Sequence, residues 1–245
     1  MARVFVSKSL CVGERVEIAG PDAHYVSHVL RLRAGDEVSL LSPDGQGHVA
    51  RLEATSRQSV IAVVLRTVAR QTEPAVCVTL LQALPKGRKF DLVVEKTTEL
   101  GVARIVPVET ARCVRRLDED RAERQVERWR ALALAAARQS GRVSPPRVEE
   151  PVSLERALSV AREHEAALLF TETDLGQPLR AVLSGRTPAS CALLIGPEGG
   201  LNETETAQAV EAGLRPVTLG PRVLRTETAA LVAVALVLHE LGGLG

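Results

Sequence analysis

Two glycine-rich segments in the second half of the chain hold the residues best suited to bind a ligand and act on it. One runs from an apolar stretch into Gly196-Pro-Glu-Gly-Gly200, and the other extends from Leu219 to Ala229. Glycines let the backbone approach a flat or phosphorylated ligand closely, although a glycine loop can also be a plain structural turn. Neither segment has the G-x-G-x-x-G pattern of dinucleotide-binding folds or the Lys-Ser/Thr of a P-loop, so neither NAD nor ATP is favoured.

Two arginines in the second segment could take part in binding or catalysis. Arg222 and Arg225 stand next to a long apolar helix and therefore need anionic partners. The sequence offers Glu198 and Glu227 for this purpose, and a bound substrate could serve equally well.

The elements that must position these segments follow an α/β pattern. From Ala75 onward, apolar runs of strand length alternate with helical patterns, which is the signature of a layer built on a parallel sheet. Ligands bind at the carboxyl ends of the strands in such a sheet, so we expect both glycine segments to meet there. The predicted strands are Val76–Leu81, Ile105–Val108, Ala166–Phe170, Cys191–Ile195 and Val217–Leu219.

Capping residues mark the helix boundaries in this half. Apolar residues recur with helical spacing over Phe90–Leu100, and Gly101 supplies the stop. Asn202 followed by Glu205 has the spacing of a capping box, and Thr226 is a possible cap for the last helix. The last helix is apolar on nearly all faces, so we expect it to be buried within the domain or against another subunit.

A basic segment lies in the middle of the chain. Lys86 to Arg147 contains 15 Lys or Arg and 9 Asp or Glu, whereas the rest of the chain is net acidic. This asymmetry indicates either a surface facing a polyanion or a solvated face with ion pairs. One predicted helix in this segment places Arg121, Arg124 and Arg128 on one face, with Trp129 interpreted as core on another. The inward positions of that helix are Ala122, Val126, Trp129, Ala133 and Ala136.

Residues 1 to about 72 are predicted to form a small β-barrel, because short strand-like runs are separated by turn residues. One helix is expected over Pro21–Arg31, capped by Asp22 and with Val26, Val29 and Leu30 on one face. Polar Arg70–Pro74 is the candidate linker. The predicted strands are Arg3–Ser7, Arg15–Ile18, Glu37–Leu41, His48–Ala54 and Val60–Val68.

The composition of the 245-residue chain excludes several classes of protein. Four cysteines without a CxxC pair predict reduced, mostly buried thiols in a cytosolic protein. The longest apolar run, Ala229–Leu238, has half the ~20 residues of a membrane span, and no secretion signal is expected. His24 and His28 lack a third ligand, so a role other than metal binding is favoured. Five aromatic residues are too few for rows of stacked bases.

These motifs, in this order, resemble the RsmE family of 16S ribosomal RNA uridine-N3 methyltransferases, in the SPOUT class of S-adenosylmethionine enzymes. The resemblance covers essentially the whole chain. Ala135 departs from it, because relatives often carry an acidic residue there. The matching segments are Arg3-Val-Phe5, His24–Arg31, Leu84–Lys89, Glu95–Gly101, Arg128–Arg130, Gln139–Arg142 and the two glycine segments.

The resemblance implies a fold and partners. Residues 1–72 would be a PUA-like β-barrel RNA-binding domain, and residues 73–245 a SPOUT methyltransferase domain with an α/β fold and a trefoil knot. The implied partners are 16S rRNA or the small ribosomal subunit, and a second copy of the chain in a homodimer. The implied location is the cytoplasm, with no membrane and no metal.

The resemblance also implies roles for individual residues. Arg225 would stabilise the uridine anion, and Glu198 or Glu227 would orient that arginine or accept the proton, or else be purely structural. S-adenosylmethionine would be held by Thr171, Ile195, Gly196, Pro197, Gly199, Gly200, Leu219, Gly220, Leu224 and Thr226. RNA would be contacted by Arg3, His24, His28, Arg31, Lys86, Lys89, Arg115, Arg116, Arg121, Arg124 and Arg128.

Two other hypotheses stay open at this point. The chain could be a methyltransferase of this fold that acts on another RNA site, or a non-catalytic ribosome-associated RNA-binding protein. The intact glycine segments favour an enzyme over a passive binder. For Lys86 and Lys89, which follow a predicted strand, phosphate contact and plain surface charge are both possible.

Overall fold

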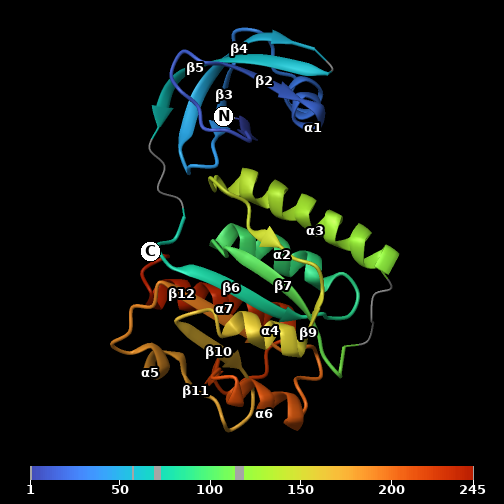
Figure 1. The fold of residues 1–245 in the computed structure, drawn as a ribbon, viewed down its shortest axis with the longest axis vertical. Helices are drawn as coiled ribbons and strands as arrows, with labels where there is room; N and C mark the ends of the chain where they lie inside the picture. Colours follow the sequence, from blue (N-terminus) through green and yellow to red (C-terminus); the bar gives the residue numbers. More distant parts are fainter. Residues whose placement is uncertain (1, 57, 69–72, 114–118, 245) are drawn as a thin grey trace. The chain divides into compact units, whose positions relative to one another are not determined.

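The computed structural model describes residues 2–56, 58–68, 73–113 and 119–244, without the side chains of 119–121. The chain divides into two compact units (Figure 1). The smaller comprises Met1–Glu73 together with Ala137–Ser144, and the larger comprises Pro74–Ala136 and Pro145–Gly245. The last turn of helix α3 (Glu119–Ser140) therefore belongs to the smaller unit.

The smaller unit is a curled five-stranded sheet in the order β1-β3-β4-β5-β2. Alternate side chains face its interior, as in β2, where Val16 and Ile18 are buried and their neighbours exposed. Strand β1 pairs in parallel with β3 and the other pairs are antiparallel. All five predicted strands are confirmed, as β1 (Ala2–Phe5), β2 (Arg15–Ala19), β3 (Glu37–Leu41), β4 (Gly47–Thr55) and β5 (Ser59–Val68).

The helix predicted over Pro21–Arg31 differs in shape from the expectation. It consists of α1 (Gly20–His24) followed by a π-helical turn, η1 (Tyr25–Val29), in which the Leu30 N–H donates to the Tyr25 carbonyl. The wider π turn shifts the helix face, so Val26 is buried whereas Val29 is 60% exposed. The prediction of Asp22 as cap is wrong, because Ala19 occupies that position.

The last turn of α3 is fastened into the smaller unit by charged side chains. Asp22 accepts an ion-paired hydrogen bond from Arg138, whose guanidinium lies 5.9 Å from the Phe5 ring centroid and 5.5 Å from that of Tyr25. Arg3 Nη1 donates to two main-chain carbonyls at the end of α3, both at 2.7 Å. A cation on the last carbonyls of a helix satisfies acceptors that would otherwise lack partners.

The larger unit is built on an eight-stranded sheet, in which seven strands follow the order β11-β13-β10-β12-β6-β7-β8 and β9 pairs with β7. Every strand pair in it is parallel. The five predicted strands are confirmed within a few residues, as β6 (Cys77–Ala83), β7 (Arg104–Glu109), β10 (Ala166–Phe170), β12 (Ser190–Ile195) and β13 (Arg215–Thr218). The others are β8 (Arg147–Val148), β9 (Val152–Ser153) and β11 (Gln177–Pro178).

Both faces of this sheet are covered by helices, which explains the uninterrupted apolar runs. In β12, Leu193 and Ile195 face one core cluster, whereas Ala192 and Leu194 face the other. The first cluster includes side chains of α3, α2 (Lys89–Leu100), α5 (Leu179–Leu183) and α7 (Thr226–Glu240). The second includes those of α4 (Leu154–Ala161) and α6 (Glu203–Glu211).

Helix α7 explains how the two glycine segments come together. It packs against α2, β6 and β12, although it follows β13, which lies two strands away from β12 in the sheet. The chain after β13 must therefore cross back past the carboxyl ends of β10 and β12 before α7 begins. Ala233, Val234 and Val237 of α7 are buried in the first core cluster, and Leu236 stays 40% exposed.

Other expectations are corrected or extended by the structure. Cys11 and Cys77 are exposed, so the thiols are not mostly buried. Cys191 is buried, and this burial raises the pKa of its thiol to about 12.

No helix among the described residues is long and apolar enough to cross a bilayer. The described side chains also contain no group of three His, Cys, Asp or Glu that could hold a metal ion.

We expect Arg138→Ala to lower the free energy of unfolding of the smaller unit by about 2 kcal/mol, because Asp22 loses its partner and two rings lose a stacked cation. Hydrogen exchange of the β1–β5 amides measures this change. The control is Arg15→Ala, whose ion pair with Glu53 is exposed and should contribute less than about 0.5 kcal/mol. Equal effects of the two substitutions would show that the end of α3 does not stabilise this unit.

Candidate functional site

A cavity of about 380 Å³ opens at the carboxyl ends of β10, β12 and β13. This volume lies within the range of small-molecule sites. Its wall is formed by the first glycine segment, the start of the loop after β10 and the chain between β13 and α7. All ten residues predicted to hold the cofactor line it, namely Thr171, Ile195, Gly196, Pro197, Gly199, Gly200, Leu219, Gly220, Leu224 and Thr226.

The first glycine segment closes tightly on itself. A Cβ at Gly196 would lie 3.2 Å from the Leu201 nitrogen and 3.3 Å from the backbone of Gly200, neither of which can move aside easily. Gly200 has φ +68°, a left-handed conformation that side chains disfavour. The segment ends in the predicted capping box of α6, where Asn202 and Glu205 exchange hydrogen bonds. Glycine is therefore required here by the backbone itself.

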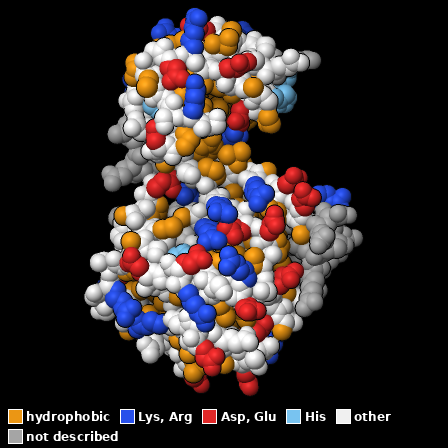
Figure 2. Space-filling model, viewed as in Figure 1, with side chains coloured by type: hydrophobic (Ala, Val, Ile, Leu, Met, Phe, Trp, Pro, Cys, Tyr) orange, Lys and Arg blue, Asp and Glu red, His pale blue; other side chains and the backbone are white. Residues whose placement is uncertain are grey.

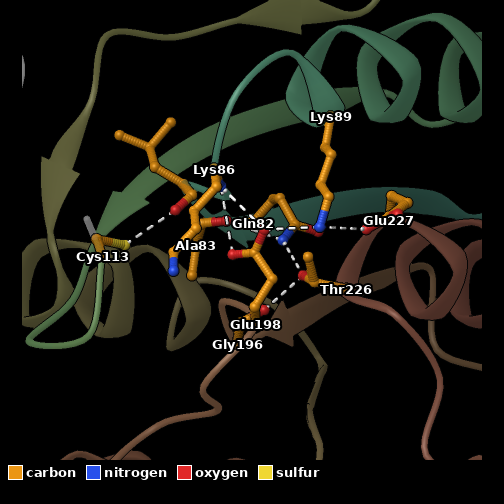
Figure 3. Close-up of polar contacts among 10 residues, drawn as sticks. Gln82, Ala83, Lys86, Lys89, Cys113, Gly196, Glu198, Thr226 and Glu227 are labelled. Atoms are coloured by element: carbon orange, nitrogen blue, oxygen red, sulfur yellow. Dashed lines mark hydrogen bonds and ion pairs between the residues drawn. The ribbon is translucent and has the colours of Figure 1, made fainter. Parts of the chain in front are cut away.

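The hydroxyl of Thr226 connects three segments at the floor of the site (Figure 3). It donates to the Gly196 carbonyl at 2.6 Å and accepts from Gln82 Nε2 at 3.0 Å. Gln82 is fully buried at the end of β6 and also donates to the Ala83 carbonyl. The prediction of Thr226 as a helix cap is wrong, because Arg225 is the N-cap of α7 and the hydroxyl is used elsewhere.

One lysine serves both carboxylates of the site. Lys89 Nζ lies 2.8 Å from Glu198 Oε1 and 3.6 Å from Glu227 Oε2 (Figure 3). The Lys86 backbone N–H also donates to Glu198, at 3.0 and 3.3 Å to its two oxygens. Of the two kinds of partner left open for Arg222 and Arg225, the structure does not show the glutamates in that role, because Lys89 reaches both carboxylates from the first turn of α2.

The contacts within this cluster shift the pKa values of Glu198 and Lys89. Burial alone would raise the pKa of the Glu198 carboxyl, but hydrogen bonds from Lys89 and from backbone N–H groups outweigh it, and the pKa is lowered. The hydrogen bond to Glu198 raises the pKa of Lys89. Glu198 is therefore a carboxylate at neutral pH and a weak proton acceptor.

Arg222 and Arg225 line the cavity and are exposed. Neither forms an ion pair with any described residue, so both guanidinium groups can reach a ligand from the second glycine segment. Arginine presents several N–H donors in a planar fork, which suits a planar base or an anion. Glu227 does not line the cavity.

Some cavity residues were missed by sequence reasoning. Arg112 donates from Nη1 to the Gly199 carbonyl at 2.6 Å, and Oε1 of Glu172 would lie 3.2 Å from a Cβ at Gly200. Both follow strands, β7 and β10, so the rule that sites form at strand ends could have found them. Gln82 could have been noticed as an amide directly after the apolar run Val76–Leu81.

The residues predicted to contact RNA divide into several groups. His24 and His28 are exposed with ring centroids 4.8 Å apart, and Arg31 is exposed beside them in sequence. Arg3 donates to carbonyls at the end of α3, and Lys89 pairs with the two carboxylates. The side chain of Lys86 is exposed, and Arg124 is exposed on α3. Arg115, Arg116 and the side chain of Arg121 lie outside the described residues.

The predicted basic stripe on α3 is partly used within the larger unit. Arg128 pairs with Asp91, which also accepts from Arg88 and from the Trp129 indole at 3.2 Å. Trp129 is core, as predicted, at 2% exposure and with its ring centroid 4.2 Å from that of Phe90. Figure 2 shows Lys and Arg interspersed with Asp and Glu on the visible face of this unit, not gathered into one patch.

Comparison with known proteins gives matches over nearly the whole chain. Residues 72–238 match the RNA methyltransferase domain family, and residues 18–65 match the RNA methyltransferase PUA domain family. The chain is 32% identical to ribosomal RNA small subunit methyltransferase E of Bacillus subtilis (strain 168), over 91% of this chain and 89% of that protein. It is 36% identical to the protein of that name from Mycobacterium tuberculosis, over 90% and 84%.

Solved structures agree with these matches. Ribosomal RNA small subunit methyltransferase E from Neisseria gonorrhoeae, bound to S-adenosyl methionine, has a TM-score of 0.87 and 32% identity, covering 98% of this chain and 97% of that one. A Legionella pneumophila methyltransferase in complex with the same cofactor has a TM-score of 0.88 and 30% identity, covering 97% and 96%.

We expect Thr226→Val to destabilise the larger unit by about 2 kcal/mol, because the Gly196 carbonyl and the buried Gln82 amide both lose a partner. Chemical denaturation followed by the fluorescence of Trp129 measures this loss. Thr228→Val makes the same change at an exposed position two residues further along α7, and should alter stability by less than about 0.5 kcal/mol. Similar values for both variants would contradict a role for the bridge.

Proposed function

Because this chain belongs to the ribosomal RNA small subunit methyltransferase E family, we propose that it methylates N3 of a uridine in 16S ribosomal RNA, with S-adenosyl-L-methionine as methyl donor. The observation that carries this proposal is the cavity where the two glycine segments meet. Its wall includes Arg225, which forms no ion pair with any described residue. The alternative, a non-catalytic RNA-binding protein, would not bind the methyl donor in this cavity.

The residues of the cavity fit the cofactor. Gly196 and Gly200 let the loop backbone itself form part of the cavity wall without side chains, and the remaining wall combines apolar with polar groups. S-adenosylmethionine, when bound, supplies an electrophilic methyl group on a sulfonium, so the reaction requires no metal. The ten lining residues predicted from the sequence, from Thr171 to Thr226, are proposed to hold it.

We propose Arg225 as the main catalytic residue. Uridine N3 carries a proton at neutral pH, so the base must become an anion before N3 can attack. The guanidinium of Arg225 would donate to O2 or O4 as this charge develops, which lowers the barrier electrostatically. Glu198 lines the cavity and could accept the proton, but its lowered pKa makes it a weak base. Glu227 would act only through Lys89.

We propose that residues 1–72 bind RNA and residues 73–245 carry the methyltransferase site. His24, His28 and Arg31 are exposed on the smaller unit, and the larger unit offers Lys86 and Arg222 beside its catalytic segments. Phosphate contacts by such cations position an RNA without reading its sequence. The small ribosomal subunit or its RNA is the proposed partner.

A homodimer in the cytoplasm is also proposed. Val223 is 78% exposed just before α7, and Leu236 is 40% exposed on it. Exposed apolar side chains on and beside a helix whose other face is buried support a second copy of the chain as their cover.

The experiment that tests this function has two parts. Calorimetry should show binding of S-adenosylmethionine or its demethylated product by the purified protein. Mass mapping of ribosomal RNA from a strain lacking the protein should show one unmethylated uridine, which complementation restores. Loss of a methyl mark on another base would instead support an enzyme for another RNA site, and absence of cofactor binding would support the binding protein.

We expect Arg225→Ala to lower the single-turnover methyl-transfer rate by about two to three orders of magnitude, because a donor to the developing anion is lost. Affinity for the cofactor should stay within about threefold, since the contribution lies in the transition state. The exposed Arg186, which does not line the cavity, gives a matched control as Arg186→Ala. A wild-type rate for Arg225→Ala at saturating cofactor and RNA would exclude this assignment.

A further inference from the structure

We propose that Lys89 is a positioning residue of the cofactor site, which acts by holding Glu198 and Glu227 on a single ammonium group. The lysine thereby keeps the first glycine segment against the start of α7. This inference rests on the proposed function, because the ligand whose binding reports it is the cofactor.

Three elements meet at this ammonium. Lys89 is the first residue of α2, and its neighbour Phe90 is only 3% exposed, so the start of the helix is anchored in the core. Glu198 lies within the glycine segment that lines the cavity, and Glu227 lies in the first turn of α7. The distances of 2.8 and 3.6 Å from Nζ mean that one charge serves both carboxylates.

The two carboxylates need this cation. Their side chains are 25% and 12% exposed, for Glu198 and Glu227 respectively, so water screens them only in part. Oε2 of Glu227 is buried without a hydrogen-bond partner among the described residues and lies 3.6 Å from the ammonium nitrogen of Lys89. Without Lys89, two like charges would share one partly buried site. Their repulsion would disfavour the packing of the first glycine segment against the start of α7.

The alternative role for Lys89 is the phosphate contact predicted from the sequence. An ammonium already shared by two carboxylates carries no surplus charge for a phosphate. Lys86 differs from it, since its backbone N–H supports Glu198 while its side chain is exposed. The geometry therefore separates two lysines that the sequence treats alike.

The test measures binding of S-adenosylhomocysteine, an unreactive probe, by calorimetry, with hydrogen exchange of residues 196–201 as a second readout. We expect Lys89→Gln to weaken binding about tenfold or more and to speed exchange in this segment. Lys89→Arg keeps the charge and should bind within about threefold of the wild type. Lys96→Gln removes a lysine of the same helix that pairs with Glu95 and Glu99, and should have no effect.

A second substitution separates electrostatic positioning from simple loss of packing. Adding Glu227→Gln to Lys89→Gln removes the surplus negative charge, so the double variant should recover most of the lost affinity. The same comparison remains decisive if Lys89→Gln alone fails to fold, since the double variant should then fold and bind.

Three results would overturn the inference. The first is unchanged affinity in Lys89→Gln, and a salt dependence of RNA binding that is shallower by about one phosphate contact would then assign this lysine to the RNA. The second is a double variant that binds no better than Lys89→Gln, and the third is a Lys89→Arg variant as weak as Lys89→Gln. If the wild-type protein itself does not bind the probe, the proposed function fails, which is a different outcome.

Discussion

The hydroxyl group of Thr226 is the interaction on which the rest of the site depends. It joins the buried end of β6, through Gln82, to the Gly196 carbonyl and to the first turn of α7. Because α7 must reach β6 and β12 after β13, the chain between them passes over the strand ends and becomes one wall of the cavity. A parallel sheet with a returning helix thus makes a binding site from two loops that are otherwise distant in sequence.

Local features could be predicted from the sequence, because they depend on neighbouring residues only. The ten strands, the Gly101 helix stop and the Asn202–Glu205 capping box follow from periodicity and from short-range hydrogen bonding. The meeting of the two glycine segments at the strand ends also followed from the α/β pattern, whereas the individual residues of the cavity wall could be named only through family resemblance. The π turn at Tyr25 could not be predicted. The Tyr25 carbonyl accepts from the N–H five residues further along instead of four, and the spacing of apolar residues does not show this difference.

Ion-pair partners were the part that sequence reasoning could not assign. The sequence offered Glu198 and Glu227, or a substrate, as partners of Arg222 and Arg225, but Lys89 reaches both carboxylates from a helix more than a hundred residues away. Arg128 and Arg3, predicted at an RNA surface, use their guanidinium groups on Asp91 and on main-chain carbonyls. Charge patterns report which cations exist, whereas the tertiary fold decides which of them stay available to a ligand.

The membership of residues 137–144 in the smaller unit has a consequence for how the protein is made. Residues 1–73 leave the ribosome first, but the helix end that satisfies Arg3 and Asp22 is synthesised more than sixty residues later. The contacts that Arg3 and Asp22 make in the finished protein therefore form only after α3 has been synthesised. Completion of the N-terminal unit is thus tied to translation of the middle of the chain, which departs from the usual order of one domain completed after another.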